Sequence, residues 1–373
     1  MSRIYLPTSE QMDDTVANLG KIAKVLGSKV DISTWEGIRK AVSLGFAPDV
    51  LPIGTQLVAS HSKYGDVVFD VVAHDYLKSA EDETAHTMTL LTHNNLESVQ
   101  YDSREAFYYN SAGLAAGTYN FTLTANYLGW LAGTYQFTLT QPLPQGGQLC
   151  ISNTTELSNG KVISYQLGEV AIIEECAITQ GNGGFSLGKF GVELNHVHRV
   201  YGGSNNYKQS AIRQFLNDST GAVVWNHETL YDRPPKWLNN MAGFMGGFGE
   251  DFLKVVGTVS LPCYANNTYE YNSSDTVKGK KYTLYDKFYL PSHNEIYGIT
   301  STSFSDGSTI FPYYNGANDA DRSKYRNGSK VGWWTRSPHS GNATGVHSVN
   351  PSGGLTGMNA TEEYGIVVAC TIV

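Results

Sequence analysis

Charge is scarce in this sequence, and basic charge most of all. Only 16% of the 373 residues are charged, and 26 Lys and Arg residues are outnumbered by 34 Asp and Glu residues, for a net charge of -8. A nucleic-acid-binding domain needs a basic surface to neutralise phosphates. We therefore expect no nucleic-acid partner.

Long apolar runs and cysteine pairs are also missing. No stretch approaches the roughly 18 apolar residues of a transmembrane helix, so we expect no membrane span. Residues 1–7 contain one basic residue and no apolar core, which argues against a secretory signal peptide. The four cysteines form no Cys-x-x-Cys pair, which predicts reduced, mostly buried thiols: Cys150, Cys176, Cys263 and Cys370. These features fit a virion component or a cytoplasmic protein.

Motifs for catalysis or cofactor binding are absent as well, because no Gly-x-Ser-x-Gly, Walker or dinucleotide-binding pattern occurs. His196 and His198 would lie on one face of a strand and are a plausible pair of metal ligands. No third ligand is spaced nearby, so His227 or His293 would have to reach them through the fold. Two hydrogen-bonding side chains are the favoured interpretation. We predict no catalytic residue, no metal site and no cofactor.

Residues 318–323 resemble the opening of a calcium-binding loop. Lys324 stands where the invariant Gly of an EF-hand belongs, and Lys330 stands where its bidentate Glu belongs. These two residues exclude an EF-hand. A structural calcium ion elsewhere stays open.

Aromatic residues, in contrast, are plentiful, with 24 Tyr, 14 Phe and 6 Trp. Tyr enrichment is typical both of β-rich cores and of binding surfaces, and composition does not decide between them. A chain of this length exceeds a typical single core, so we expect two or three structural units.

The first unit, residues 1–48, is predicted to be helical. Residues 8–26 begin with a capping box of Thr8 and Gln11 and carry an apolar seam at heptad spacing: Met12, Val16, Leu19, Ala23 and Leu26. So short a helix needs packing partners to persist. This favours a homo-oligomer or attachment to a larger assembly over packing of the helix on its own domain.

A second helix is predicted after a capping box of Ser33 and Glu36, and it ends at Gly45. Its apolar face carries three residues: Trp35, Ile38 and Val42. Residues 47–52 are interpreted as a linker to the next unit.

The main domain is predicted in two parts, residues 49–99 and residues 191–373. Three strand patterns open the first part, at residues 55–59, 67–73 and 87–92. In the second part, residues 209–217 form an amphipathic helix with Ile212, Phe215 and Leu216 inward, and residues 252–259 and 287–290 form strands. A Met- and Phe-rich stretch at 239–249 is interpreted as a core cover, with an adaptable binding loop as the alternative.

An all-β insertion is predicted at residues 100–190. The octet Ala-Gly-Thr-Tyr-x-Phe-Thr-Leu occurs at 116–123 and again at 132–139, and its alternation predicts a half-buried strand in each copy. Further strands are expected at 149–151, 162–167 and 170–178. We interpret the insertion as a spacer or accessory module.

The last residues, 331–373, differ from the rest in having large apolar anchors at both ends. Trp333–Pro338 opens this segment, and Ile366–Val373 closes it as a buried strand. Between them Gly, Asn and Ser occupy turn positions. Because a long irregular segment inside a compact domain is usually functional, we interpret it as a ligand-facing surface on a rigid frame.

The opening sequence Trp-Trp-Thr-Arg-Ser-Pro is similar to the Trp-Trp-Leu-Arg-Ser-Pro signature of a bacterial and phage family with a C-type-lectin-like fold. Ser210–Asn217, Asp286–Leu290 and Phe311–Tyr314 also match this family. The ending Val368–Val373 resembles that of the variable proteins of diversity-generating retroelements, a group that includes the phage major tropism determinant. The resemblance covers residues 50–100 and 195–373, and it implies an α+β chain with a C-terminal C-type-lectin-like domain.

The resemblance also implies a non-enzymatic receptor-binding protein of a phage or prophage, whose diversified C-terminal face binds a host-surface protein or glycan. The frame of this face would comprise Trp333, Trp334, Arg336, Val346, Val349, Leu355, Val367 and Ala369. The predicted ligand contacts are the polar or unusual residues between them: Thr335, His339, Asn342, Thr344, His347, Ser348, Ser352, Thr356, Met358, Thr361, Glu363 and Tyr364. Thr335 replaces the Leu of the signature, which indicates that this position varies.

Two other functions compete with this prediction: a constant lectin-like module that binds carbohydrate or protein, and a structural virion decoration protein. The Glu-Pro-Asn or Gln-Pro-Asp tripeptide and the later Trp-Asn-Asp of calcium-dependent lectins are absent, so sugar binding through calcium is not supported. The chain also resembles formylglycine-generating enzymes, at the level of the fold alone. Their chemistry needs two neighbouring cysteines, and Cys370 has no near neighbour in the sequence, so Cys263 would have to approach it through the fold.

Overall fold

The computed structural model describes residues 30–103, 107–108, 115–123, 133–139, 148–149, 162–164, 204–226, 234–265, 280–298, 308–340 and 345–373. Some predictions lie outside the described residues. They are the helix at 8–26, the strand at 170–178, and the roles of Cys150, Cys176, His196, His198, His227, Asn342 and Thr344.

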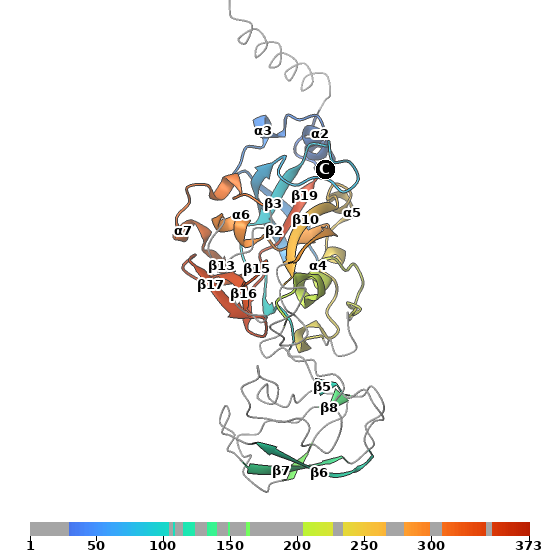
Figure 1. Ribbon diagram of the computed structural model, residues 1–373. Helices are drawn as coiled ribbons and strands as arrows, with labels where there is room; N and C mark the ends of the chain where they lie inside the picture. The colour runs from blue at the N-terminus through green and yellow to red at the C-terminus, as the bar shows by residue number, and fades with distance from the viewer. Residues whose placement is uncertain are drawn as a thin grey trace, which may run out of the picture.

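The main body is α+β and is built on two five-stranded sheets with short helices around them (Figure 1). The first sheet has the strand order β1-β2-β3-β19-β12, and all neighbours in it are antiparallel. Its strands are β1 (Gln56–His61), β2 (Gly65–His74), β3 (Met88–Thr92), β19 (Ala369–Ile372) and β12 (Phe288–Tyr289). The last strand of the chain therefore lies between β3 and β12, which joins the two sequence segments predicted for the main domain.

The second sheet has the strand order β17-β16-β15-β18-β4. Strands β15 and β18 are parallel, and the other neighbours are antiparallel. The strands are β17 (Leu355–Asn359), β16 (Gly345–Val349), β15 (Trp333–Pro338), β18 (Glu363–Gly365) and β4 (Ser98–Gln100). This sheet holds most of the C-terminal segment, with β17 at one edge.

Short helices and two ribbons complete the main body. The α-helices are α2 (Trp35–Ser43), α3 (Ala47–Val50), α4 (Ala211–Leu216), α5 (Glu250–Leu253), α6 (His293–Tyr297) and α7 (Asp319–Arg322). The 3-10 helices are η3 (Tyr207–Gln209), η4 (Lys236–Leu238), η5 (Met245–Gly247) and η6 (Pro312–Tyr314). The ribbons pair β10 (Val259–Ala265) with β11 (Lys280–Asp286) and β13 (Lys324–Arg326) with β14 (Ser329–Val331). None of the described helices is long and apolar enough to cross a membrane.

The predicted strands of the octet repeat are confirmed. They form β6 (Gly117–Leu123) and β7 (Gly133–Leu139), which pair antiparallel so that Tyr119 stands opposite Phe137 and Phe121 opposite Tyr135. Strand β9 (Val162–Ser164) runs parallel to β7, and β5 (Phe107–Tyr108) pairs with β8 (Gln148–Leu149). The two copies of the repeat are therefore the two arms of one antiparallel pair.

The second predicted helix is confirmed as α2, but its N-cap is Thr34 rather than Ser33. The Thr34 hydroxyl oxygen accepts the Gly37 N–H, while the Ser33 hydroxyl donates to the Asp31 carboxylate. The linker predicted at 47–52 is wrong. Residues 47–50 form α3, and Phe46, Ala47 and Leu51 are buried. Pro48 fits there because the first turn of a helix does not need its N–H.

The strand predicted at 252–259 is also wrong, except at its last residue. Phe252 belongs to α5, and the strand begins only at Val259. The buried residues Phe252, Val255 and Val256 recur at helical spacing, and the four backbone N–H groups of residues 253–256 bond back to the carbonyls of Gly249, Glu250 and Phe252. The apolar run was therefore a buried helical turn, which a short apolar segment does not distinguish from a strand.

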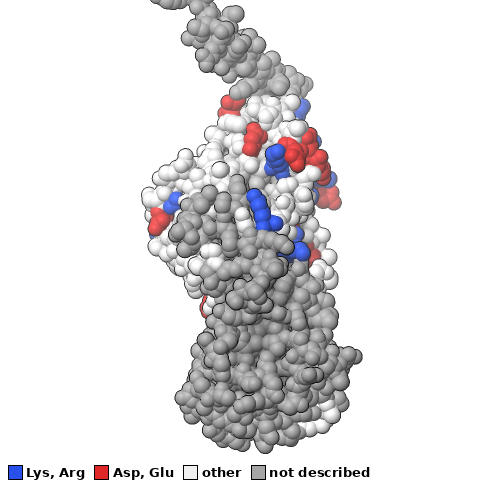
Figure 2. All heavy atoms as spheres, in the orientation of Figure 1, with Lys and Arg blue, Asp and Glu red and all other residues white. Residues whose placement is uncertain are grey.

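Charged side chains are unevenly distributed over the face shown in Figure 2. Most of the coloured residues gather toward the end that carries α2 and α5, and fewer lie over the region of β16 and β17.

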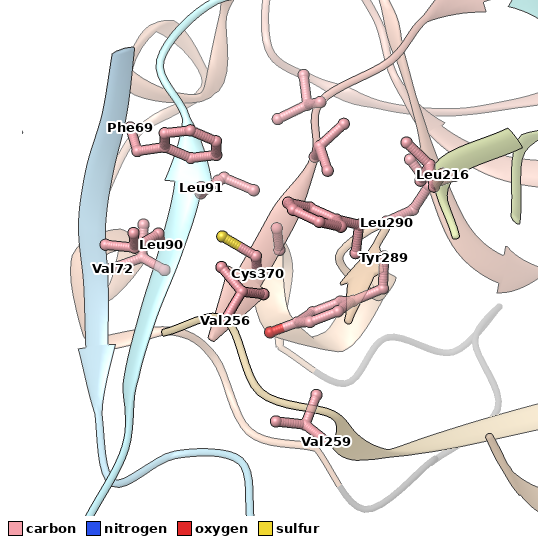
Figure 3. Packing of buried hydrophobic residues seen from close by; sticks show 14 of the residues in the cluster. Phe69, Val72, Leu90, Leu91, Leu216, Val256, Val259, Tyr289, Leu290 and Cys370 are labelled. Carbon is pink, nitrogen blue, oxygen red and sulfur yellow. The ribbon is translucent and has the colours of Figure 1, made fainter. Parts of the chain in front are cut away.

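The core lies beside β19, as Figure 3 shows. Cys370 of β19 is flanked by Leu90 of β3 and by Tyr289 of β12. Helix α2 contributes Ile38 and Val42 to the same core, and the rings of Trp35 and Phe252 lie 4.5 Å apart. The predicted inward face of α4 is confirmed, since Ile212, Phe215 and Leu216 are buried. In the Met- and Phe-rich stretch Phe244 and Phe248 are buried, so it covers the core as predicted.

Candidate ligand-binding face

Strand β15 connects the surrounding elements through its side chains. The indole N–H of Trp333 donates to the Arg322 carbonyl over 3.1 Å, and that of Trp334 donates to the Val99 carbonyl over 2.9 Å. Both rings are fully buried, so these bonds satisfy polar groups that water does not reach. The two indoles thus attach β15 to α7 on one side and to β4 on the other.

Arg336 attaches the same strand to α6. Its two terminal nitrogens each lie 2.7 Å from one carboxylate oxygen of Glu295, and both side chains are almost completely buried. Glu295 also accepts the Ser292 N–H in the capping box of α6, and Arg336 donates to the Leu290 carbonyl. Such a pair is tolerated in a core because each charge is matched by a charge and by hydrogen bonds.

Three predicted ligand contacts belong to this buried frame instead. Thr335, His347 and Ser348 are at most 1% exposed. The Thr335 hydroxyl donates to the His347 carbonyl over 2.6 Å, and the Ser348 hydroxyl donates to the Val346 carbonyl over 3.1 Å. Their burial leaves no surface for a ligand, so the prediction of direct contact is corrected at these positions. The hydroxyls of Thr335 and Ser348 serve hydrogen bonding inside the sheet.

One predicted frame residue lies on the surface. Leu355 is 38% exposed, whereas the other seven frame residues are at most 1% exposed. Leu355 stands opposite Val349 in the register of β16 and β17, but it is on the edge strand. The prediction of Leu355 as frame was wrong, because an apolar residue on an edge is often left exposed.

A tight turn at Asn350–Gly354 fixes the register of β16 and β17. The Asn350 side-chain oxygen accepts the N–H groups of Ser352 and Gly354. Gly353 has φ +89°, and a Cβ there would lie 1.5 Å from the Asp319 carbonyl oxygen, so only glycine fits. Tyr297 of α6 donates its hydroxyl to the Gly353 carbonyl over 2.6 Å. The turn is therefore held against α6 and α7.

A column of rings leads from α6 to the surface of this sheet. The ring centroids of Tyr297 and His293 lie 5.4 Å apart, those of His293 and His347 4.5 Å, and those of His347 and His339 5.0 Å. The first three residues come from α6 and β16, and His339 follows β15 directly. His339 is half-buried, and its backbone N–H donates to the Gly345 carbonyl over 2.8 Å.

A pocket of ≈ 300 Å³ opens where this column reaches the surface. Its lining comprises His339, Gly345, Gly357, Met358, Asn359 and Glu362. In the register, Gly345 stands opposite Asn359 and His347 opposite Gly357. Residues that stand opposite each other on paired strands share a sheet face, and so do residues two apart on one strand. Gly345, His347 and Gly357 therefore lie on one face of the sheet, and the His339 ring packs on that face against His347. A Cβ at Gly357 would lie 3.4 Å from the Cδ2 of His339, so the missing side chain of Gly357 leaves the space in front of His339 open.

The other six predicted contacts among the described residues lie on β17, on β18 and in the turns that flank them. Ser352 and Glu363 are exposed, and Thr356, Met358 and Thr361 are half-buried. Tyr364 is half-buried against Trp334, with ring centroids 5.2 Å apart, and burial together with the Glu362 charge raises the pKa of its hydroxyl. Asn342 and Thr344 lie outside the described residues. Of the twelve predicted contacts, seven therefore lie on or at the surface near β17 and its flanking turns.

Four residues of the pocket were missed by sequence reasoning: Gly345, Gly357, Asn359 and Glu362. Glycine and asparagine were interpreted as turn residues, and Glu362 was passed over between two predicted contacts. Glu362 follows a turn closed by its own N–H on the Asn359 carbonyl, 2.9 Å away. The signal that would have found them is the pairing of β16 with β17.

The two cysteines among the described residues belong to different strands. Cys263 and Cys370 are both buried, on β10 and β19 respectively. Burial raises the pKa of the Cys370 thiol far above its ordinary value. A thiol that stays protonated in an apolar strand is a poor nucleophile.

Metal-binding clusters are likewise not found among the described residues, where no three His, Cys, Asp or Glu side chains come together. The calcium-like sequence at 318–323 has another role. Asn318 and Asp321 form the capping box of α7, so the acidic residues serve the helix N-terminus.

The fold and the face define an α+β protein with a buried signature strand beneath a small polar pocket. Comparison with known families matches residues 171–373 to a domain of unknown function, DUF6273. This match spans more than half of the chain, so the protein belongs to the DUF6273 family. No curated protein and no solved structure matches the chain.

Proposed function

We propose that this protein is a non-enzymatic receptor-binding protein that displays its C-terminal face on a C-type-lectin-like frame. The observation that carries the proposal is the division of residues 331–373 into two populations. The signature side chains Trp333, Trp334, Thr335 and Arg336 all bond inward, while β17 and its flanking turns present half-buried and exposed side chains around a pocket.

This division is what a diversified segment requires. Residues that vary must be able to change without loss of core packing, because core substitutions cost several kcal/mol and surface substitutions usually about 0.5 kcal/mol or less. Exposed Ser352 and Glu363 meet that requirement. Buried Thr335, His347 and Ser348 do not, and we place them in the constant part.

The sequence resemblance supplies the rest of the proposal, namely a phage or prophage protein diversified by a retroelement and carried on a virion. The predicted helix at 8–26 would mount the protein or make it oligomeric. The ligand would be a host-surface protein or glycan, bound at the C-terminal face.

Sequencing of the DNA that flanks the gene tests this proposal. We expect a near-copy of the codons for residues 331–373 beside a reverse-transcriptase gene, with mismatches at adenines. The mismatches should fall on exposed or half-buried residues such as Ser352, Thr356 and Thr361. The codons for Trp333, Arg336 and Thr335 are the internal control and should be identical in both copies.

Intact flanks without such a copy would contradict diversification and leave a constant lectin-like binding module. Mismatches concentrated on the codons of buried residues would instead contradict the division of residues 331–373 into a buried constant part and a variable surface. Separately, light scattering of a variant that lacks residues 1–27 tests the oligomer. An unchanged mass would rule out that role for the helix.

A further inference from the structure

We propose that the Met- and Phe-rich stretch at residues 239–249, called the cover below, is released from β1 when His61 takes up a proton in weakly acidic solution. This switch does not depend on which ligand binds at the C-terminal face. Two features carry the inference: the place of the His61 ring between β1 and the cover, and the hydrogen bonds of its two nitrogens.

The His61 ring packs directly against the cover. His61 is 5% exposed. Its ring centroid lies 5.0 Å from that of Phe244 in a stacked arrangement, and 4.7 Å from that of Phe248 in an edge-to-face arrangement. A Cβ at Gly247 would lie 2.2 Å from two ring atoms of His61, so the cover crosses the ring at that point. The ring can therefore move into water only if the cover moves away.

The hydrogen bonds of the two ring nitrogens select the neutral form. The backbone N–H groups of Lys63 and Tyr64 donate to Nδ1 over 3.0 and 3.3 Å. Nδ1 must therefore act as an acceptor and cannot carry a hydrogen. The hydrogen of the neutral ring is then on Nε2, which donates to the Phe244 carbonyl over 2.9 Å. One ring thus connects the turn after β1 to the cover.

Protonation of His61 would break this arrangement. The second hydrogen would be on Nδ1, where it would face the N–H groups of Lys63 and Tyr64, and both bonds to Nδ1 would be lost. The positive charge would also remain in a buried site, which is unfavourable without a paired anion. The bond from Nε2 to the Phe244 carbonyl is possible in both forms, so it does not offset these losses.

Burial and one neighbouring charge keep the ring neutral at pH 7. Burial lowers the pKa of His61, and the charge of Lys63 lowers it further, although the bond to the Phe244 carbonyl raises it. The other charged or titratable side chains on the described elements around His61 are Tyr64, Asp66, Glu97, Asp218, Glu250, Asp251 and Arg326.

Histidine is the side chain that changes its charge in weak acid, because its ordinary pKa alone lies between about pH 5 and 8. Glu97 is the carboxylate that bonds to both Lys63 and Tyr64. Burial raises the pKa of Glu97, but the hydrogen bonds from Lys63 and Tyr64 bring it below its ordinary value. Glu97 therefore stays ionised while His61 is protonated.

Release of the cover would break a defined set of backbone hydrogen bonds. The N–H of Ser62 donates to the Gly247 carbonyl, that of Phe244 to the Phe215 carbonyl, and that of Gly246 to the Asp218 carbonyl. In the open form His61 should titrate near its ordinary pKa of about 6.5. As the pH falls below this value the open form binds more protons than the closed form, so its population should rise up to about tenfold per pH unit.

Hydrogen exchange of the full-length protein at pH 7.5 and 5.5 tests the switch, with rates corrected for the intrinsic pH dependence of exchange. We expect the protection of the Ser62, Phe244 and Gly246 amides to fall up to about tenfold at pH 5.5. The amide of Thr92, which donates to the Val368 carbonyl, should remain better protected than these at pH 5.5, because the first sheet stays folded.

The variant His61→Asn removes the titration but keeps a side-chain oxygen that accepts the N–H groups two and three residues further on. Its cover should have the same protection at both pH values. His74→Asn is the matched control. Burial also lowers the pKa of His74, which bonds to the Leu51 carbonyl, but His74 lies at the opposite end of β2 from Gly65, the partner of His61. The cover of this control should lose protection like that of the unchanged protein.

The inference is overturned if the cover of the unchanged protein is equally protected at both pH values, or if His61→Asn shows the same loss. It is also overturned if the loss is absent from His74→Asn, or if the cover and Thr92 are equally protected at pH 5.5. If His61→Asn does not fold, Lys63→Gln decides at a side chain that is 41% exposed. It removes a charge that opposes protonation, so the loss should begin at a higher pH. An onset at the same or a lower pH would contradict the switch.

Discussion

Strands β15 and β17 belong to one sheet and are separated only by β16, yet their side chains have opposite roles. Five of the six residues of β15 are buried, and its polar groups bond to α6, α7, β4 and β16. None of the five residues of β17 is buried. Position in the sheet explains the difference, because β15 is covered on both faces and β17 forms an edge. A frame and a tolerant face can therefore lie within 10 Å of each other, two strand spacings of about 5 Å.

The largest effect is expected at the ion pair that fixes β15. Arg336→Met leaves the Glu295 carboxylate buried without its partner, which should cost about 3–5 kcal/mol of unfolding free energy. Urea denaturation measures the loss. The double variant Arg336→Met with Glu295→Leu should recover much of it, since no charge remains buried. As a matched exposed pair, Arg39 and Glu36 lie 2.7 Å apart on α2, and Arg39→Ala should leave the midpoint unchanged. Equal losses from the two single variants would contradict the difference between frame and surface.

Two residues that stand opposite each other allow the sharpest comparison. Val349 is fully buried on β16, and its partner Leu355 on β17 is 38% exposed. Val349→Ala removes buried methyl groups and should cost about 2–3 kcal/mol. Leu355→Ala should cost less than about 1 kcal/mol, although it removes more atoms. Both are measured by chemical denaturation, and the reverse order would mean that β17 is covered in solution.

The buried side chain of Lys324 should make the unfolding free energy depend on pH. Burial lowers the pKa of Lys324 to about 8, although the Asp70 carboxylate 3.5 Å away raises it. An unfolded Lys titrates near 10.4. Between pH 8 and 10 the unfolded chain therefore binds more protons, so the unfolding free energy should rise with pH by about 2 kcal/mol, and below pH 8 this contribution is flat. Denaturation at several pH values checks the rise, and Lys324→Met should lack it. The same slope in both proteins would show that another group titrates.

A smaller effect tests the corrected position of the signature. Thr335→Val keeps the side-chain shape but removes the hydroxyl that donates to the His347 carbonyl. We expect a loss of about 1–2 kcal/mol, because a buried acceptor is left unsatisfied. Thr356→Val on half-buried β17 is the control and should change stability little. If Thr335→Val is as stable as the unchanged protein, position 335 is free to vary after all.

Sequence reasoning found the frame more readily than the face. Trp333, Trp334 and the closing apolar strand were identified because large apolar side chains in a strand pattern are nearly always buried. The inward face of α4 followed from its helical spacing in the same way. The prediction that Leu355 is buried in the frame was wrong, since the sequence does not show which strand forms the edge of the sheet.

The face was harder to predict because a polar side chain in a strand is expected at the surface. Thr335, His347 and Ser348 are polar, but the hydroxyls of Thr335 and Ser348 bond to carbonyls within their own sheet. The pocket lining includes two glycines that share a sheet face only through the pairing of β16 with β17. That pairing is set by the Asn350 turn and its contacts with α6 and α7. Such long-range contacts leave no periodic signal in the sequence.

The most direct measurement is the thermal unfolding of one protein that carries six alanine substitutions on the face: His339, Ser352, Thr356, Thr361, Glu362 and Glu363. If these side chains form a surface that the frame does not need, the unfolding midpoint should stay within about 2 °C of the unchanged protein, which corresponds to about 1 kcal/mol for a chain of this size. A cooperative fall of about 10 °C or more would show that they belong to the core, and the division between frame and face would be wrong.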